Sequence, residues 1–429
     1  MKYPISFILI LILAFAACKH ENTPIVSTRF TDSLLIHSSP SAMEKMLAGD
    51  MAFWEERLKS DPGSYTAMGR YAGNLVQRFH LYGNIRDLVE ADSIEQVIEN
   101  ITAGKEAGVM RSRAALDITR HRFKEADSYV QKALAIGSEK YASTLMYFDT
   151  RFELGSYILA AQALKSCAAS NEYGYFFRLA KWKHLQGEAD SAIYYMQQAA
   201  NWAGNNATLK QTAFSNMADL YLHEGKPEKA NKLYVDNLRQ NAADYHSLQG
   251  LGRIALVHDH DAGRAEKIFR YIATKNQLPD PYYNLEWVAE ERGDANATKK
   301  AAETFIKKTN DPRYGSMYHK YQVELYTGIL NQPAKAVAIA TEETDNRATP
   351  QTYCWLVWAL HKAGNDVQAW KLYQDHVSGK PLETLELFWM GKMMKDMGKN
   401  YNANAFFKAA NKNRYDLSPG KQRELKELL

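Results

Sequence analysis

A six-residue phrase that recurs about every 34 residues constrains this chain more than any other feature of its sequence. Nine copies run from HRFKEA, which ends at Ala126, to GKNYNA, which ends at Ala403. The spacings between the last residues of successive copies are 34, 32, 38, 35, 33, 38, 33 and 34. A period of roughly 20–50 residues is the signature of repeat architectures, in which each unit buries its apolar face on its neighbours. The sequence therefore predicts a stacked array.

Each copy of the phrase reads as the junction between two helices. Six copies begin with glycine, which ends a helix at little cost in a left-handed conformation. Eight copies end in alanine, whose small side chain lets the second helix approach the first closely. A larger apolar or aromatic residue usually follows four positions later, on the same helical face. These residues are Val130, Leu164, Met196, Tyr234, Phe269, Tyr373 and Phe407.

A helix-turn-helix unit of this length and pattern resembles the tetratricopeptide repeat family. The resemblance covers about residues 107–429 and implies an all-α, right-handed superhelical solenoid whose concave face is lined by the first helices. Residues 41–106 are expected to form degenerate repeats, with an insertion where residues 80–95 break the phase. Residues 419–429 are expected to form a capping helix. Each repeat would contact only its neighbours, so stability would be distributed along the array.

The N-terminus has the layout of a secretory signal peptide over residues 1–17. Its apolar run of about ten residues is too short to span a bilayer about 30 Å thick. The four residues FAAC that end at Cys18 resemble the bacterial lipobox, in which the cysteine becomes the lipid-modified first residue. The resemblance implies a lipid anchor on Cys18, a flexible tether over residues 18–40, and a place in the envelope of a Gram-negative bacterium, at the periplasmic or surface face of the outer membrane. The alternative is an ordinary signal peptide with an unmodified Cys18.

Composition and motifs give no positive sign of catalysis. The net charge of +4, from 53 basic and 49 acidic residues, gives no electrostatic argument for nucleic acid. Three cysteines allow neither a disulfide framework nor a cysteine-based zinc site. No phosphate loop, zinc-protease helix or nucleophile turn occurs, and Gly250-Leu251-Gly252 lacks the third glycine of a dinucleotide fingerprint. We therefore predict no enzymatic activity, no cofactor and no metal.

One short segment could still bind a divalent cation. His258-Asp259-His260-Asp261, with His246 upstream, alternates imidazole and carboxylate groups. Spacing of two residues on a turn converges ligands poorly, and the segment falls at a polar junction between helices. We favour a solvated turn over a metal site.

First-helix positions define the expected partner-binding groove. Trp287 and Trp358 are either solvent-facing anchors of a binding hot spot or aromatics packed between repeats. Cys167 is expected in the core, and Cys354 in a first helix. The predicted groove residues are Phe177, Lys181, His184, Ser215, Asp219, His223, Tyr283, Trp287, Glu290, Cys354, Trp358 and His361.

These features favour a lipid-anchored envelope scaffold that binds one or more proteins or peptides through its concave groove. We predict that it binds no nucleic acid. The alternative is an outer-membrane lipoprotein that captures a glycan or nutrient for a transporter, with the 26 Tyr and 8 Trp as stacking platforms. A third possibility, an enzyme with carboxylates inside the curve, rests only on the abundance of Asp and Glu.

Overall fold

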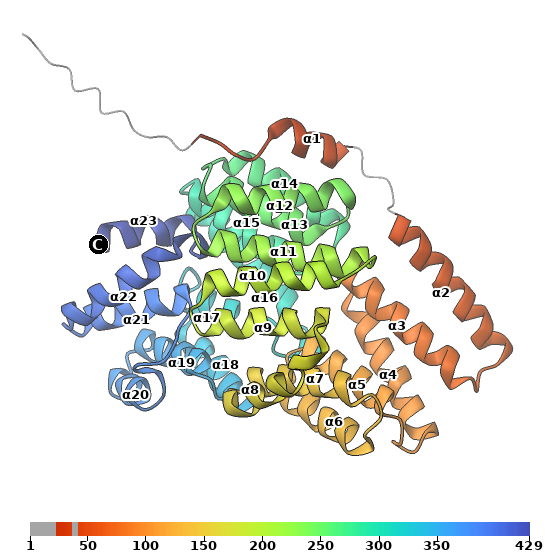
Figure 1. Cartoon of the computed structure of the whole chain (residues 1–429). Helices are drawn as coiled ribbons and strands as arrows, with labels where there is room; N and C mark the ends of the chain where they lie inside the picture. The colour runs from red at the N-terminus through yellow and green to blue at the C-terminus, as the bar shows by residue number, and fades with distance from the viewer. Residues whose placement is uncertain (1–22, 37–41) are drawn as a thin grey trace, which may run out of the picture.

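The computed structural model describes residues 23–36 and 42–429, and every regular element within them is helical (Figure 1). This confirms the predicted all-α solenoid of helix-turn-helix repeats. The predicted signal peptide and Cys18 lie outside the described residues. The α-helices are α1 (Thr28–Ile36), α2 (Ala42–Ser60), α3 (Tyr65–Tyr82), α4 (Ile85–Ile101), α5 (Ala107–Thr119), α6 (Phe123–Ile136), α7 (Lys140–Glu153), α8 (Tyr157–Ser166), α9 (Tyr173–Leu185), α10 (Ala189–Trp202), α11 (Ala207–His223), α12 (Pro227–Gln240), α13 (Tyr245–Val257), α14 (Ala262–Lys275), α15 (Asp280–Glu291), α16 (Ala295–Thr309), α17 (His319–Thr327), α18 (Pro333–Asn346), α19 (Pro350–Lys362), α20 (Asp366–Leu372), α21 (Thr384–Asp396), α22 (Asn400–Lys412) and α23 (Pro419–Leu428). Short helical turns are η1 (Ala168–Ser170), η2 (Pro312–Tyr314), η3 (Tyr373–Val377) and η4 (Arg414–Asp416).

Each copy of the repeated phrase lies at a junction between two helices, as its residues predict. Its six glycines have φ between 68° and 80°, and a second helix begins within the next few residues. The eight phrase alanines are almost completely buried, as is Thr298, which takes their place in α16. The larger residue four positions later is also buried, from Val130 in α6 to Phe407 in α22. Small and large side chains therefore alternate along the packed face of each second helix.

The expected insertion near residues 80–95 is absent from the structure. Helices α3 and α4 form an ordinary hairpin, joined only by Gly83 and Asn84. The phase breaks because both helices are longer than most in the array, with 18 and 17 residues. Helix α2 packs mainly on α3 and lies at the N-terminal end of the array, with Met43 also touching Thr208 of α11.

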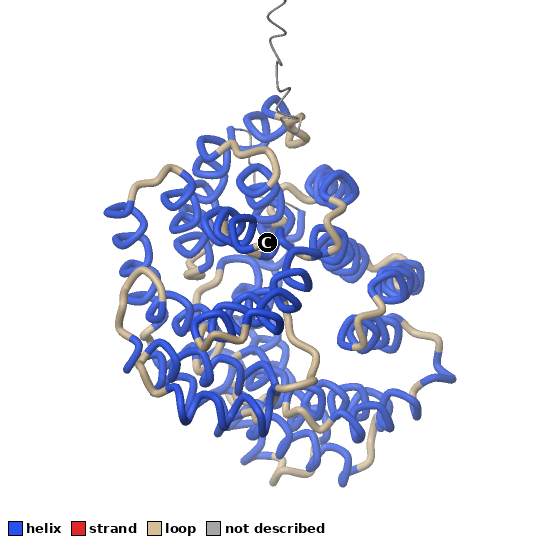
Figure 2. Tube along the Cα trace, turned by 90° about the vertical axis from the view of Figure 1, so that its left-hand side faces the viewer, coloured by secondary structure: helices blue, strands red, loops and turns tan. Residues whose placement is uncertain are grey.

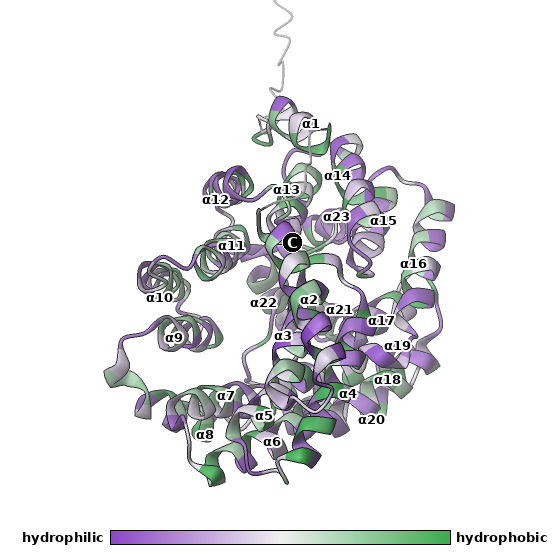
Figure 3. Ribbon diagram, turned by 90° about the vertical axis from the view of Figure 1, so that its right-hand side faces the viewer, coloured by the Kyte–Doolittle hydropathy of each residue, from purple (hydrophilic) through white to green (hydrophobic). Residues whose placement is uncertain are grey.

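The array winds into a superhelix whose successive turns touch each other. Figure 3 shows α9–α12 and α14–α16 on opposite sides of the molecule. Residues at or just after the ends of the first helices α3, α5, α7 and α11 meet residues at or after the ends of α14, α16, α18 and α22. We call this line of contacts the seam. Four of its side-chain contacts join residues 190 to 195 positions apart. The seam contacts include Gln277 N to Tyr82 O (2.7 Å), Ser316 N to Arg120 O (3.2 Å), Arg347 Nη1 to Glu153 Oε2 (2.9 Å) and Asn413 Nδ2 to His223 O (3.0 Å). The expectation that each repeat contacts only its neighbours is therefore wrong.

Asparagines at the ends of second helices supply part of the seam. The side-chain amides of Asn276, Asn346 and Asn413 donate to carbonyls at the ends of α3, α5 and α11, at distances of 2.8–3.1 Å. The last carbonyls of a helix have no partner within the helix and need one elsewhere. One superhelical turn thus satisfies the helix ends of the turn before it.

Two glycines allow the seam to close. Gly83 and Gly315 have φ of 68° and 60°, a region that other residues rarely adopt. A Cβ atom on Gly83 would lie 2.7 Å from the backbone nitrogen of Leu278, and one on Gly315 would collide with the carbonyl oxygen of Arg120. The backbones of the two turns approach too closely there for any side chain.

The sequence predicts a C-terminal helix that caps the last repeat, and the observed helix also packs against a repeat in the middle of the array. Helix α23 packs against both α15 and α22, and the C-terminus lies near the middle of the view in Figure 2. The backbone nitrogen of Gly420 donates to Glu290 Oε2 at 2.9 Å, and Lys421 Nζ lies 2.8 Å from Glu324 Oε1. The C-terminal segment therefore covers the inner side of repeats in the middle of the array.

Part of the expected tether is docked. Helix α1 lies over α14 (Figure 1), and the backbone nitrogens of Ile25 and Val26 donate to the two carboxylate oxygens of Asp259 at 3.0 and 2.9 Å. Val26 is also buried against the core. Residues 23–36 therefore belong to the folded body rather than to a flexible tether.

The apolar core is unevenly distributed. One large cluster of buried side chains runs through α3, α4 and α11–α23 and includes Leu116 of α5, whereas the rest of the buried apolar side chains of α5–α11 form three small separate clusters. No helix among the described residues combines the length and the apolar character that crossing a membrane requires.

Candidate functional site

A cavity of about 300 Å³ lies inside the superhelix, between the first helices α11, α13, α15 and α17 and the C-terminal segment. It combines charged groups with aromatic rings. The lining side chains that carry charge or aromatic character are Asp219, Tyr234, His246, Arg253, Asp280, Tyr283, Phe305, Tyr321, Tyr415 and Asp416.

Asp219 and His246 form an ion pair in this cavity. His246 Nε2 lies 2.8 Å from Asp219 Oδ2, and the Tyr234 hydroxyl donates to Asp219 Oδ1 at 2.5 Å. The charge of Asp219 raises the pKa of His246 to about 9. Burial alone would raise the pKa of Asp219, but the charge and hydrogen bond of His246 outweigh it and lower that pKa. Both groups are therefore ionised at neutral pH.

Arg253 brings a further cation to the cavity wall. Its guanidinium carbon lies 5.4 Å from the ring centre of Trp287, and its Nε donates to Asn284 Oδ1 at 3.2 Å. Across the cavity, burial raises the pKa of Asp280, which accepts a hydrogen bond from the Tyr318 hydroxyl at 2.8 Å. The cavity thus offers cations, hydrogen-bonding groups and aromatic faces to a small polar molecule.

The predicted groove residues separate into several environments. Ser215, Tyr283, Trp287, Cys354 and Trp358 are buried, with 0–5% of their surface exposed. Asp219 and Tyr283 line the central cavity, whereas Lys181 and His184 line a second one of about 190 Å³. Phe177 stacks on Tyr173, Glu290 holds α23, and His361 pairs with Asp366 and Asp396. These residues therefore do not form one open groove, partly because the C-terminal segment occupies its middle.

Trp287 and Trp358 pack between helices, which is the second of the two alternatives that the sequence left open. Only 3% and 4% of their surfaces are exposed. Trp358 stacks on Trp389 with the ring centres 5.8 Å apart, and its Nε1 donates to Thr327 Oγ1 at 3.0 Å. Neither indole is available as a solvent-facing anchor. Cys354 is likewise enclosed, and burial raises the pKa of its thiol.

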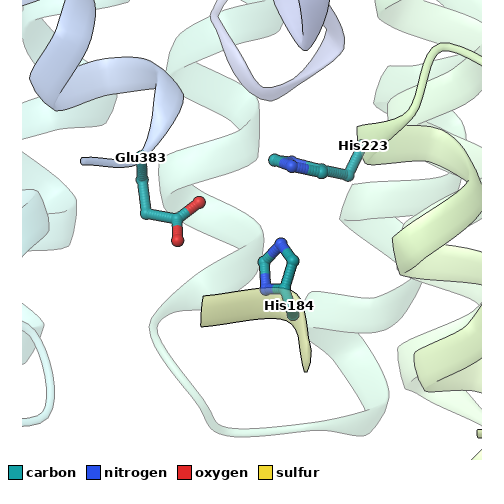
Figure 4. A group of neighbouring side chains, drawn as sticks. All are labelled: His184, His223 and Glu383. Atoms are coloured by element: carbon teal, nitrogen blue, oxygen red, sulfur yellow. The ribbon is translucent and has the colours of Figure 1, made fainter. Parts of the chain in front are cut away.

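His184, His223 and Glu383 come together at the seam (Figure 4). One nitrogen of each imidazole and one oxygen of the carboxylate lie within 4.8 Å of one another. The two histidines stand near the ends of consecutive first helices, and Glu383 directly precedes α21, one superhelical turn later. The sequence placed both histidines in the groove but gave no reason to add Glu383, which is about 200 residues away from His184.

Among the described residues, the side chains of the His258–Asp261 turn do not gather as a metal-ligand group, and only His260 of the four is exposed. Asp259 is fully enclosed and binds the N-terminal segment, while His260 Nδ1 lies 3.1 Å from Glu291 Oε1. Asp261 accepts a hydrogen bond from the backbone nitrogen of Arg264 and so caps α14. His246, the upstream histidine, pairs with Asp219 instead.

An exposed group of aromatic side chains lies on α9 and α10. Phe176 stacks with Tyr195 and with Trp202, at ring-centre distances of 6.3 and 6.4 Å. Tyr194 packs edge-on against Tyr195, and 57% of Tyr194 and 54% of Trp202 are exposed. We call these four residues the α9–α10 aromatic surface. Clustered exposed aromatics of this kind are typical of binding surfaces.

Sequence reasoning missed this surface because it looked only at first-helix positions. Tyr194 lies in a second helix, on the side away from the buried Ala192, Met196 and Ala199, and Trp202 is the last residue of the same helix. Aromatic residues at positions opposite a predicted packed face were the available signal. Asp416 offered no such signal, because its partner His223 lies 193 residues away in the chain.

Comparisons with known proteins assign no function. No protein-family model matches the chain, and no curated protein matches it. Among solved structures, a tetratricopeptide repeat protein from Parabacteroides merdae aligns over 60% of this chain and 98% of its own, with 12% identity and a TM-score of 0.35. The Cut9–Hcn1 hetero-tetramer of the APC/C aligns over 81% of this chain and 62% of its own, with 16% identity and a TM-score of 0.48. Yeast Tom70 aligns over 93% of this chain and 96% of its own, with 10% identity and a TM-score of 0.42. At these TM-scores the likenesses carry no argument about partners or activity.

Proposed function

We propose that this chain is a lipid-anchored envelope scaffold that binds another protein through the α9–α10 aromatic surface. The observation that carries the proposal is the exposure of Tyr194 and Trp202 beside stacked rings on a well-formed repeat. Large aromatic side chains are the commonest anchors of protein interfaces because they bury much area at little entropic cost. The concave groove, which the sequence favoured, is partly filled by the C-terminal segment and loses its two tryptophan anchors.

The local packing also favours this surface. Of the residues in α9, only Ala180 is fully buried, and the small core of α9–α11 is separate from the large one. Most of the apolar surface of this repeat is therefore only partly covered by the chain itself. A partner that covered it would complete the burial.

Affinity capture after crosslinking in cells tests the interface. A Tyr194→Ala, Trp202→Ala variant should lose a specific protein that the unaltered chain captures. A matched control is Val367→Ala, Tyr401→Ala, which removes an apolar residue and an exposed tyrosine from the second helix α20 and from α22. Loss in the first variant but not in the control supports the proposal. Identical capture by both variants would exclude this surface as the interface.

The lipid anchor rests on the N-terminal sequence, with FAAC ending at Cys18. Ile25, which is docked on Asp259, lies only seven positions after Cys18, and seven steps of extended chain span at most about 25 Å. An acyl chain on Cys18 would therefore hold the α1 and α14 side of the solenoid close to the membrane. Cys18→Ala should move the protein from the membrane fraction to the soluble fraction. Continued sedimentation with membranes would contradict the anchor.

A second candidate function, capture of a small polar ligand, is favoured by the central cavity. Arg253, His246 and the ring of Tyr321 face a space of about 300 Å³, which is near the lower end of ligand-pocket volumes. Thermal-shift screens with oligosaccharides and other polar metabolites test it. A ligand that stabilises the unaltered chain but not an Arg253→Gln variant would favour capture, and an empty screen would remove this candidate.

A further inference from the structure

The geometry at His184, His223 and Glu383 is that of an incomplete metal coordination shell. One potential ligand atom from each residue lies within 4.8 Å of the other two. Ligands about 2.0–2.1 Å from a tetrahedral zinc ion lie about 3.4 Å apart. The side chains would have to close by at most about 1.4 Å, a movement within reach of small χ rotations. Figure 4 shows the three side chains pointing into a common space.

His223 is already oriented as a ligand. Its Nδ1 lies 2.6 Å from Asp416 Oδ2, which leaves Nε2 as the free nitrogen. A metal-binding histidine almost always donates its other nitrogen to a carboxylate or carbonyl group, which fixes the ring and its tautomer. Asp416 is itself held by the Thr384 hydroxyl at 2.8 Å, next to Glu383 in the chain. The supporting contacts of a metal site are therefore in place.

In the part of the chain that the structure describes, the side chains of His184 and Glu383 make no hydrogen bond or ion pair outside this cluster. Glu383 is the N-cap residue of α21, yet its carboxylate makes no capping hydrogen bond to that helix. The charge of Glu383 acts on both histidines and also on the buried Lys320. The imidazole of His184 packs edge-on against that of His223, with ring centres 4.9 Å apart. An imidazole and a carboxylate that make no other hydrogen bonds to the described residues are suited to a cation.

We propose that these three residues bind one divalent transition-metal ion, for which Zn²⁺ is the best match, and that the ion fastens two turns of the superhelix together. Two imidazoles and one carboxylate form a ligand set that zinc accepts, and water would complete the tetrahedron. Calcium and magnesium prefer shells made entirely of oxygen and fit poorly. The two histidines belong to α9 and α11, and Glu383 belongs to the loop before α21. The ion would therefore link repeats that are about 200 residues apart in the chain.

Metal titration of the purified, tag-free protein tests the site, independently of any partner. Calorimetry with Zn²⁺ should show one site per chain, and Co²⁺ should give the visible absorption of a tetrahedral complex. His184→Gln and Glu383→Gln should each weaken zinc binding by about tenfold or more. Zinc should also raise the unfolding midpoint of the unaltered protein, since it binds only the folded chain. A matched control is His260→Gln, because His260 is exposed and bonded to Glu291, away from the cluster.

The outcomes separate cleanly. Loss of the single site in the cluster variants but not in the control supports the proposal. The same zinc stoichiometry and affinity in a His184→Gln, Glu383→Gln double variant would overturn it, and so would the absence of binding to the unaltered protein at about 100 µM zinc. Glu383→Gln changes only the charge of a partly exposed side chain, so it keeps the test valid if the histidine variant fails to fold. Circular dichroism of each variant confirms the folded state.

Discussion

Replacing Gly250 by alanine tests the packing of the solenoid most directly. Gly250 lies in α13, and a Cβ atom there would come closer than 3.0 Å to three ring carbons of Tyr234 in α12. Tyr234 is fully buried, and its hydroxyl is bonded to Asp219, so the ring has little freedom to move aside. Overpacking of this kind costs about 1–3 kcal/mol. The glycine pair at Gly250 and Gly252 therefore serves close aromatic packing rather than nucleotide binding.

The helical preference of alanine opposes this cost and must be separated from it. Gly73→Ala in α3 is the matched control, because a Cβ atom there would have no neighbour within 4 Å. That variant should gain about 0.5–1 kcal/mol from helix propensity alone. Since the gain is common to both variants, Gly250→Ala should be less stable than Gly73→Ala by about 1–3 kcal/mol.

Urea unfolding followed by far-ultraviolet circular dichroism measures this difference. Gly391→Ala provides a repeat of the experiment, because its Cβ atom would lie within 3.0 Å of two ring carbons of Phe407. If Gly250→Ala and Gly73→Ala unfold at the same urea concentration with the same slope, Tyr234 does not pack against α13 as described. The assignment of the larger residues to the inter-helix contact would then be refuted.

Three further predictions follow from single contacts. Burial raises the pKa of Glu286 from 4.5 to about 8, so the stability that depends on its proton is complete below pH 4.5 and is lost as the pH rises through about 8. Glu286→Gln should therefore stabilise the protein by about 2–4 kcal/mol at about pH 9 but hardly at about pH 5. Equal effects on the free energy of unfolding at the two pH values would contradict the burial of this carboxyl group. Asp259→Asn leaves one acceptor oxygen for the backbone nitrogens of Ile25 and Val26, so docking of the N-terminal segment should weaken by about 1–2 kcal/mol. Hydrogen exchange at the amides of those two residues should become faster. Unchanged exchange would show that other contacts hold the segment. Ala230→Leu enlarges a completely buried side chain in α12 and should lower the free energy of unfolding by about 1–3 kcal/mol, whereas an unchanged urea midpoint would mean that this face of the helix is not packed.

The sequence by itself determined the repeat unit. The spacing of small residues such as Ala230 and large ones such as Tyr234 marks one face of each second helix, and glycines such as Gly225 mark the turn before it. These signals suffice because a helix pair is stabilised by contacts between residues close in sequence. The class of fold and the identity of most core residues followed from them.

Only the tertiary structure decided where the ends of the array lie and which side chains meet across it. The relative rotation of neighbouring repeats accumulates along the chain, and a small change in each would separate the seam. That rotation depends on the shapes of all the packed side chains, which the repeated phrase does not record. The burial of Trp287 and Trp358, the docking of residues 23–36 on Asp259, and the meeting of His184 with Glu383 all depend on it. The sequence determined the helix pair because its contacts are local, and the structure alone revealed the candidate sites because theirs are not.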